Sequence, residues 1–168
     1  DLFTTVSPFN GERINRFTLP PQGIEDLVAR VKINRILGAY VGTCHQRCTG
    51  LDCMAALSIV AFDMDQKNGT PYYSRFLDFL KHMQKNDFTA NASVTDVKGD
   101  RSLAPHEQPD KDLYLRVAEK RKDGIVVNGA KVHQTGSLSA HELIVLPTRA
   151  MGKGDEDYSV AFAVPADT

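Results

Sequence analysis

The stretch from Phe76 to Thr95, FLDFLKHMQKNDFTANASVT, decides the fold because its hydrophobic periodicity changes part-way along. Its first part spaces apolar residues three or four apart, which predicts a helix that follows Pro71 and contains Phe76, Phe79, Leu80 and Met83. After Asn86 the pattern turns into a short β-type run, Ser93-Val94-Thr95. The chain is therefore predicted to change from helices to strands near residue 88.

Two more helices are predicted upstream. Apolar residues at three- and four-residue spacing predict a helix from about Glu25 to Tyr40, after a Pro20-Pro21-Gln22-Gly23 turn: Ile24, Leu27, Val28, Val31, Ile36 and Leu37. A second helix is predicted from about Asp52 to Lys67, with Asn68-Gly69 as its stop. Helices in succession indicate a small bundle, so residues 1–88 are predicted to form a helical domain.

Downstream of residue 88 the sequence predicts strands. The β-type runs are Ser93–Thr95, Leu113–Val117, Gly124–Val127, Leu143–Leu146 and Ser159–Val164. Turn signals at Lys122-Asp123-Gly124 and Asn128-Gly129 indicate antiparallel hairpins. We therefore expect an α+β protein with a β-rich domain over residues 89–168.

Composition limits the function classes. The 168 residues carry a formal net charge of −1, and the basic residues are dispersed, so nucleic acid is not an expected partner. Membrane-span and secretory-signal patterns are absent from the sequence, which favours a cytoplasmic protein. The chain opens at Asp1 without a methionine and stops after an apolar run, so we expect a fragment of a longer protein.

All the cysteines lie between Cys44 and Cys53, a clustering that favours a metal or redox site over a disulfide framework. On a helix, Cys44 and Cys48 would lie on nearly the same face and could reach one metal. On spacing alone, two cysteines at this distance are more often buried small residues than metal ligands. His45 and Arg47, within the segment, favour the thiolate form and so a ligand role.

Two thiolates do not complete a metal site that usually takes four ligands. Cys53 lies in an apolar stretch and is interpreted as a core residue. The histidines do not form a ligand spacing with the cysteines and are interpreted as ordinary surface or hydrogen-bonded side chains: His82, His106, His133 and His141. The remaining ligands are expected outside this chain.

Two loops have the composition of cofactor-binding segments. Thr95–Ser102 follows a strand and combines hydroxyls, a glycine and two cations, which suits a phosphate-bearing cofactor. A solvated turn is the alternative, since the segment has no P-loop or dinucleotide-binding glycine pattern. Gly129–Ser137 is rich in hydrogen-bond donors after an apolar strand, so it is either a cofactor-facing rim or a hairpin connection.

The chain resembles the acyl-CoA dehydrogenase superfamily. The resemblance rests on the order of four features along the chain: the helices, the TDxxGDRS loop, the DGIxxxGAK strand and the QTG segment. The resemblance runs from Ile14 to Thr168 and is to the branch of the 4-hydroxyphenylacetate 3-hydroxylases and 4-hydroxybutyryl-CoA dehydratases. The Cys44–Cys48 pair followed by Gly50-Leu51-Asp52 favours the dehydratases. The resemblance implies a helical bundle followed by an antiparallel β-barrel or sandwich middle domain, with the C-terminal helical domain missing.

The resemblance also implies roles for individual residues. Cys44 and Cys48 would be two ligands of a 4Fe-4S cluster whose other ligands, a histidine and a cysteine, lie in the missing C-terminal region. Gln46 would lie near the substrate, and Thr135 near the reactive flavin nitrogen. The implied FAD contacts are Val94, Thr95, Asp96, Lys98, Gly99, Asp100, Arg101, Ser102, His133, Gln134 and Thr135.

The implied activity is dehydration of 4-hydroxybutyryl-CoA to crotonyl-CoA, with isomerisation of vinylacetyl-CoA, by a flavin radical route in a homotetramer. The isolated chain would lack the cluster-bound histidine and is expected to be inactive alone. One alternative is a hydroxylase of aromatic substrates that uses reduced FAD and oxygen. Another is a non-catalytic metal-binding module.

Overall fold

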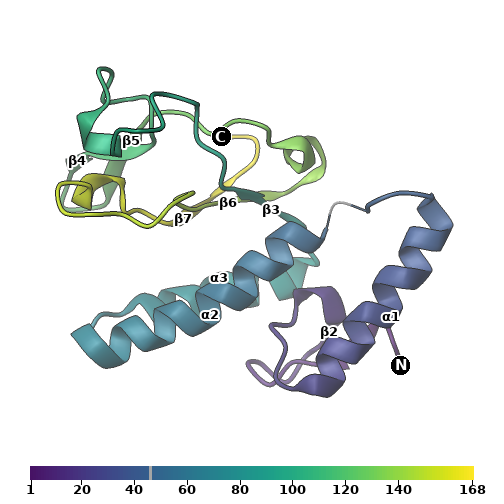
Figure 1. The fold of residues 1–168 in the computed structure, drawn as a ribbon. Coiled ribbons are helices and arrows are strands. Elements are labelled where there is room, and N and C mark those ends of the chain that lie inside the picture. Colours follow the sequence, from purple (N-terminus) through teal and green to yellow (C-terminus); the bar gives the residue numbers. More distant parts are fainter. Residues whose placement is uncertain (46) are drawn as a thin grey trace.

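A computed structural model describes residues 1–45 and 47–168 (Figure 1). The helices are α1 (Ile24–Val41), α2 (Cys48–Asn68) and α3 (Tyr72–Asn86). The strands are β1 (Thr4–Val6), β2 (Arg13–Asn15), β3 (Ala90–Ser93), β4 (Arg116–Lys120), β5 (Ile125–Asn128), β6 (Glu142–Val145) and β7 (Phe162–Pro165). The order of helices before strands confirms the α+β prediction, although the β1–β2 hairpin was not predicted and α2 begins four residues earlier than expected.

Local capping explains where the helices begin and end. Gly42 and Gly69 follow α1 and α2 with φ of 67° and 64°, in the left-handed region that glycine adopts without strain. The Asp65 carboxylate accepts hydrogen bonds from Tyr72 N and Tyr73 N, both at 2.9 Å, and so satisfies free N–H groups at the start of α3. The predicted stop at Asn68-Gly69 is therefore confirmed.

The principal sheet has the order β3-β6-β7 and is mixed, because β6 runs parallel to β3 and antiparallel to β7. In the part of the chain that the structure describes, the sheets do not close into a barrel, and the principal sheet is mixed where an antiparallel one was expected. The parallel pairing requires a crossover, and the segment between β3 and β6 supplies it. Short-range turn signals carry no information on such a pairing.

The two predicted hairpin turns had different outcomes. Strands β4 and β5 pair antiparallel across Lys122-Asp123-Gly124, as predicted. Asn128-Gly129 does not close a hairpin; it leads to an isolated antiparallel bridge between Asp96 and Lys131. The chain after β5 therefore returns to the end of β3, and this return brings the two candidate cofactor loops together.

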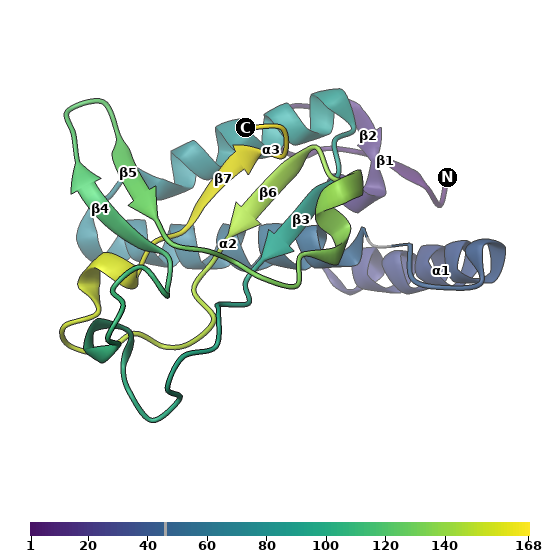
Figure 2. The same ribbon diagram turned by 90° about the horizontal axis from the view of Figure 1, so that it is seen from above.

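One hydrophobic core joins the helices to the sheet, which lies across α2 and α3 (Figure 2). Leu80 and Met83 of α3 and Ile144 of β6 are fully buried in it. The contact of α2 with β3 depends on Gly50, where a Cβ atom would lie 2.1 Å from the Ala90 carbonyl oxygen. A glycine at this position therefore sets how closely the start of α2 approaches β3.

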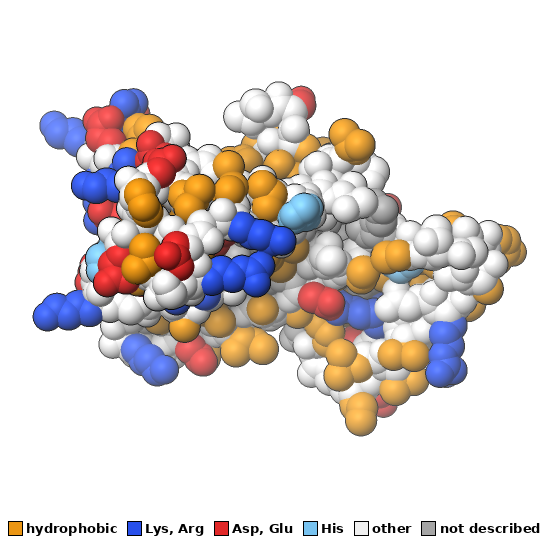
Figure 3. All heavy atoms as spheres, turned by 45° about the horizontal axis from the view of Figure 1, so that its top comes forward, with side chains coloured by type: hydrophobic (Ala, Val, Ile, Leu, Met, Phe, Trp, Pro, Cys, Tyr) orange, Lys and Arg blue, Asp and Glu red, His pale blue; other side chains and the backbone are white. Residues whose placement is uncertain are grey.

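The apolar stripe that predicts α1 faces largely away from this core. Ile24, Leu27, Val28 and Val31 are all exposed, whereas Ile33, which is not part of the stripe, is buried. Figure 3 shows that apolar side chains reach the surface at several places on the face that it presents. Periodicity thus identified the helix correctly but not the face that packs. Among the residues described, no helix is long and apolar enough to cross a membrane.

Candidate functional site

A cavity of about 310 Å³ brings the cysteine pair and the second candidate loop together. Its lining comes from the segment between α1 and α2, from the start of α2, from β3 and from the segment that precedes β6: Cys44, Cys48, Thr49, Asn91, Ala92, His133, Gln134, Thr135 and Gly136. The sequence pointed to the thiols and to this loop separately, and the fold places them on the walls of one cavity.

The two thiols meet across a loop. Cys48 is the first residue of α2, whereas Cys44 lies in the non-helical segment after α1, so the two thiols do not share one helix face. Their Sγ atoms are nevertheless 4.0 Å apart. Burial raises the pKa of the Cys48 thiol, and the neighbouring Cys44 thiol raises it further. A bound metal would have to displace the Cys48 proton to obtain a thiolate ligand.

The side chains of His45 and Arg47, which were expected beside the thiols, contact groups on other elements. The His45 ring nitrogen Nε2 lies 2.9 Å from Asn34 Oδ1, and its ring lies 5.2 Å from that of Phe17. Arg47 forms an ion pair with Asp87 at 2.6 Å. These contacts attach the cysteine segment to α1 and to the end of α3, which is a structural role.

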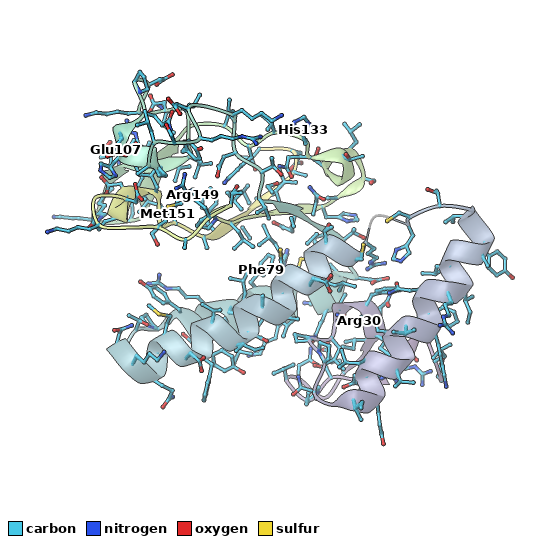
Figure 4. All side chains as sticks on the ribbon, viewed as in Figure 1. Arg30, Phe79, Glu107, His133, Arg149 and Met151 are labelled. Carbon is cyan, nitrogen blue, oxygen red and sulfur yellow. The ribbon has the colours of Figure 1, made fainter. Side chains whose placement is uncertain are left out.

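The second loop faces the cavity from the β-rich half. His133 has φ of 58°, an uncommon value for a residue other than glycine, and this conformation turns the chain from β5 toward Thr135. Figure 4 shows His133 and Glu107 toward opposite ends of the β-rich half. Gln134 Nε2 donates to Val132 O at 2.6 Å, which holds the turn, and Gly136 is buried against Asn91.

The first loop divides into a buried part and an exposed part. Asp96 is buried in an ion pair with Lys131, whose Nζ also donates to Val94 O at 3.0 Å. Val132 N donates to Thr95 O at 2.9 Å, so this part is attached to the start of the second loop. No pattern in the sequence pointed to this role of Lys131.

The remainder of the first loop is a surface turn. Asp100 Oδ1 accepts from Ser102 N at 2.9 Å and from Ser102 Oγ at 2.6 Å, and these bonds lower the pKa of the Asp100 carboxyl. Lys98 and Arg101 are exposed, and Gly99 packs closely against Gln108. None of these residues lines the thiol cavity. The predicted FAD contacts are therefore divided between the cavity and a neighbouring surface.

Gln46, the residue expected near the substrate, lies outside the described residues. Cys53 is buried in the core of α2, where burial raises its pKa, and this confirms its interpretation as a core residue. Among residues 1–45 and 47–168, no group of three or more histidine, cysteine or acidic side chains could by itself hold a metal ion. The described part of the chain thus offers a pair of soft ligands and no third.

The donor set of the cavity is compatible with both predicted cofactors. Two adjacent thiols are the soft ligands that iron-sulfur clusters use. The amides of Asn91 and Gln134 and the hydroxyl of Thr135 offer the donors and acceptors that fix the orientation of a bound organic cofactor. In the first loop, the buried Asp96 Oδ2 atom has no hydrogen-bond partner among the described residues.

A second, larger cavity of about 580 Å³ lies between the β1–β2 hairpin and the end of α3. Arg13, Arg47 and Lys85 contribute cations to its lining, and Arg47 is already paired with Asp87. None of the residues predicted to contact a cofactor lines it. The thiol cavity is therefore the stronger candidate site, because it holds metal-ligating groups.

Comparisons with known proteins show the family to which the chain belongs. The family described as 4-hydroxyphenylacetate 3-hydroxylase N terminal matches residues 1–168. The chain is 50% identical, over 99% of its length, to the 4-hydroxybutyryl-CoA dehydratase/vinylacetyl-CoA-Δ-isomerase of Clostridium aminobutyricum, and it covers 34% of that protein. It is 24% identical to a 4-hydroxyphenylacetate 3-monooxygenase oxygenase component of Geobacillus sp. (strain PA-9), over 96% of the chain and 33% of that protein.

Solved structures have the same fold. An oxygen-tolerant archaeal 4-hydroxybutyryl-CoA dehydratase from N. maritimus superposes with a TM-score of 0.96 at 42% identity, over 99% of this chain and 33% of that one. The oxygenase component of a 4-hydroxyphenylacetate 3-monooxygenase complexed with FAD superposes at 0.77 with 22% identity, over 99% of this chain and 34% of that one. The chain spans about a third of the length of the curated relatives named above.

Proposed function

The chain belongs to the 4-hydroxyphenylacetate 3-hydroxylase N-terminal family, and from this premise we propose that it forms part of a 4-hydroxybutyryl-CoA dehydratase with vinylacetyl-CoA Δ-isomerase activity. The observation that carries the proposal is the cavity in which Cys44 and Cys48 face Gln134 and Thr135. An aromatic hydroxylase needs the second candidate loop, Gly129–Ser137, which we call the flavin loop, but it does not need the thiol pair. The identity of 50% to the Clostridium aminobutyricum dehydratase supports the same choice.

In the proposed enzyme, Cys44 and Cys48 hold one side of a 4Fe-4S cluster, and the rest of the protein supplies its other ligands. FAD is held by Val94–Asp96, by Lys98–Ser102 and by His133–Thr135, with Thr135 nearest the reactive ring. When bound, FAD supplies one-electron chemistry and the cluster supplies a Lewis acid for the substrate hydroxyl. The residues of this chain position both groups around an acyl-CoA substrate, with Gln46 close to it.

Several features of the whole protein belong to the same proposal. Residues 1–88 form the helical domain and residues 89–168 the flavin-binding middle domain, in a cytoplasmic homotetramer. The C-terminal region of the protein contributes the catalytic histidine, so the chain by itself is inactive. Dehydration of 4-hydroxybutyryl-CoA by the isolated chain would contradict the proposal that the catalytic histidine lies in the C-terminal region.

The test is made on the full-length protein, purified without oxygen. We expect FAD, iron, sulfide and dehydration of 4-hydroxybutyryl-CoA. Cys44→Ala and Cys48→Ala should each lose iron, sulfide and activity, whereas Cys53→Ala should retain all three because Cys53 lies in the core and not in the cavity. A full iron and sulfide content in both cavity variants would contradict the ligand assignment.

The same preparation separates the alternatives. An aromatic hydroxylase of the 4-hydroxyphenylacetate 3-monooxygenase type would contain no cluster and would hydroxylate a phenol with reduced FAD and oxygen, and the relative from Geobacillus makes this the nearest rival. A non-catalytic metal-binding module would contain no flavin. Cluster and flavin in one protein, lost separately in variants of the thiols and of the flavin loops, would exclude both.

A further inference from the structure

Asn91 occupies the wall between the two halves of the proposed site. It lies in β3, is 6% exposed, and lines the cavity between the thiols and the flavin loop. Two segments approach β3 closely, and each does so at a glycine: α2 at Gly50 and the segment before β6 at Gly136. A Cβ atom at Gly50 would lie 2.1 Å from the Ala90 carbonyl oxygen, and one at Gly136 would lie 2.5 Å from Asn91 Oδ1. β3 is therefore the shared support of both segments.

The Asn91 carboxamide is also the polar link between these segments. Thr49 Oγ1 donates to Asn91 Oδ1 at 3.5 Å, and Asn91 Nδ2 donates to Gln134 Oε1 at 3.5 Å. Gln134 is attached in turn to Val132 O. Thr49 directly follows Cys48, so a continuous path leads from a thiol residue to the flavin loop through Asn91.

We propose that Asn91 is a positioning residue that sets the separation of the cysteine segment and the flavin segment. The inference rests on the proposed function, in which a metal centre and a flavin act on one substrate. Such a reaction requires both groups to be held at a fixed distance, and small displacements are costly to the rate. Asn91 suits this role because its amide presents an acceptor to one segment and a donor to the other.

The test compares three variants of the full-length enzyme. Asn91→Ala removes both hydrogen bonds, and Asn91→Asp keeps the shape and the acceptor but removes the donor to Gln134. Ser93→Ala is the matched control, because Ser93 lies two residues further along β3, is 3% exposed, and its hydroxyl has no partner among the described residues. The measurements are FAD and iron content, the visible circular dichroism of the bound flavin, kcat, KM and the pH profile.

We expect Asn91→Ala to retain FAD and iron, to change the flavin dichroism and to lower kcat about 10- to 100-fold, with KM nearly unchanged. Asn91→Asp should regain rate as the pH falls, because a protonated carboxyl again donates to Gln134. The wild-type enzyme and Ser93→Ala should show neither the altered spectrum nor this pH dependence.

Other results would overturn the proposal. Asn91→Ala with the kcat and spectrum of Ser93→Ala would do so, and so would a loss of activity that merely follows a loss of bound FAD or iron. If Asn91→Ala does not fold, Asn91→Asp decides by the presence or absence of the pH-dependent recovery. A wild-type enzyme without FAD or cluster would instead refute the proposed function, so the two failures are distinguishable.

Discussion

The ammonium group of Lys131 forms a buried ion pair with the carboxylate of Asp96, and the two side chains are only 8% and 5% exposed. The pair joins the end of β3 to the segment Gly129–Ser137, and Lys131 Nζ also donates to Val94 O. The other carboxylate oxygen of Asp96 has no partner among the described residues. Lys131 is therefore the residue that compensates this buried charge.

Lys131→Met is expected to destabilise the protein by about 3 to 5 kcal/mol, because it leaves the Asp96 charge buried and unpaired. The double variant Lys131→Met/Asp96→Leu should recover much of this loss, since replacing both partners removes the charge. Urea unfolding measures both. Arg121→Ala, which breaks the exposed pair with Glu119, should leave the midpoint unchanged. A double variant no more stable than the single one would argue against the ion pair as the cause.

Gly50→Ala is expected to separate α2 from β3, because its Cβ atom would lie 2.1 Å from the Ala90 carbonyl oxygen. Overpacking of this kind costs about 1 to 3 kcal/mol. Gly38→Ala is the matched control, since Gly38 lies within α1 and a methyl group there would meet no neighbouring segment within 4 Å. That control should gain about 0.5 to 1 kcal/mol from helix propensity. Thermal unfolding compares the two, and equal shifts would refute the close approach.

The contact between Asp155 and His106 is expected to be sensitive to acid. Burial alone would raise its pKa, but hydrogen bonds from the His106 ring, Gly152 N and His106 N hold the pKa below its ordinary value. Because the pKa is lowered in the folded state, the ionised carboxylate stabilises the protein fully at pH values above its unfolded pKa of about 3.9. This stabilisation is lost as the pH falls through the pKa of the folded state.

Asp155→Asn should therefore be less stable than the wild type near neutral pH, and the difference should shrink as the pH falls below about 4. Unfolding free energies measured across this range test the prediction. Asp157→Asn, a change at an exposed neighbour, serves as the control and should follow the wild type. A difference between Asp155→Asn and the wild type that stays constant down to the lowest pH would show that the charge of Asp155 is not the cause.

The three thiols are expected to react with an alkylating reagent in the order of their exposure. Cys44 is exposed, Cys48 is half-buried with a raised pKa, and Cys53 is buried with a raised pKa. Because the thiolate is the reacting form, Cys44 should be modified first and Cys53 only on unfolding. Mass spectrometry of the cofactor-free protein gives the order. Early modification of Cys53 would contradict its place in the core.

The parts of the structure that the sequence predicted are those encoded over a few residues. Helix periodicity and the stop at Asn68-Gly69 placed the helices, and Lys122-Asp123-Gly124 placed one hairpin. Asn91 could not be identified in this way, because a single asparagine between two alanines has no distinctive pattern. Its role follows only from the approach of α2 and Gly136 to the same strand.

By itself the sequence determined the succession of helices and strands, the cysteine pair and the composition of the two loops, since these depend on local spacing and residue type. Only the tertiary structure decided that β3 and β6 run parallel and that Cys44 meets Cys48 across a loop. It also placed the His45 ring against Asn34 and the Arg47 guanidinium against Asp87. The reason is physical: each outcome depends on contacts between segments that pack together only in the folded chain.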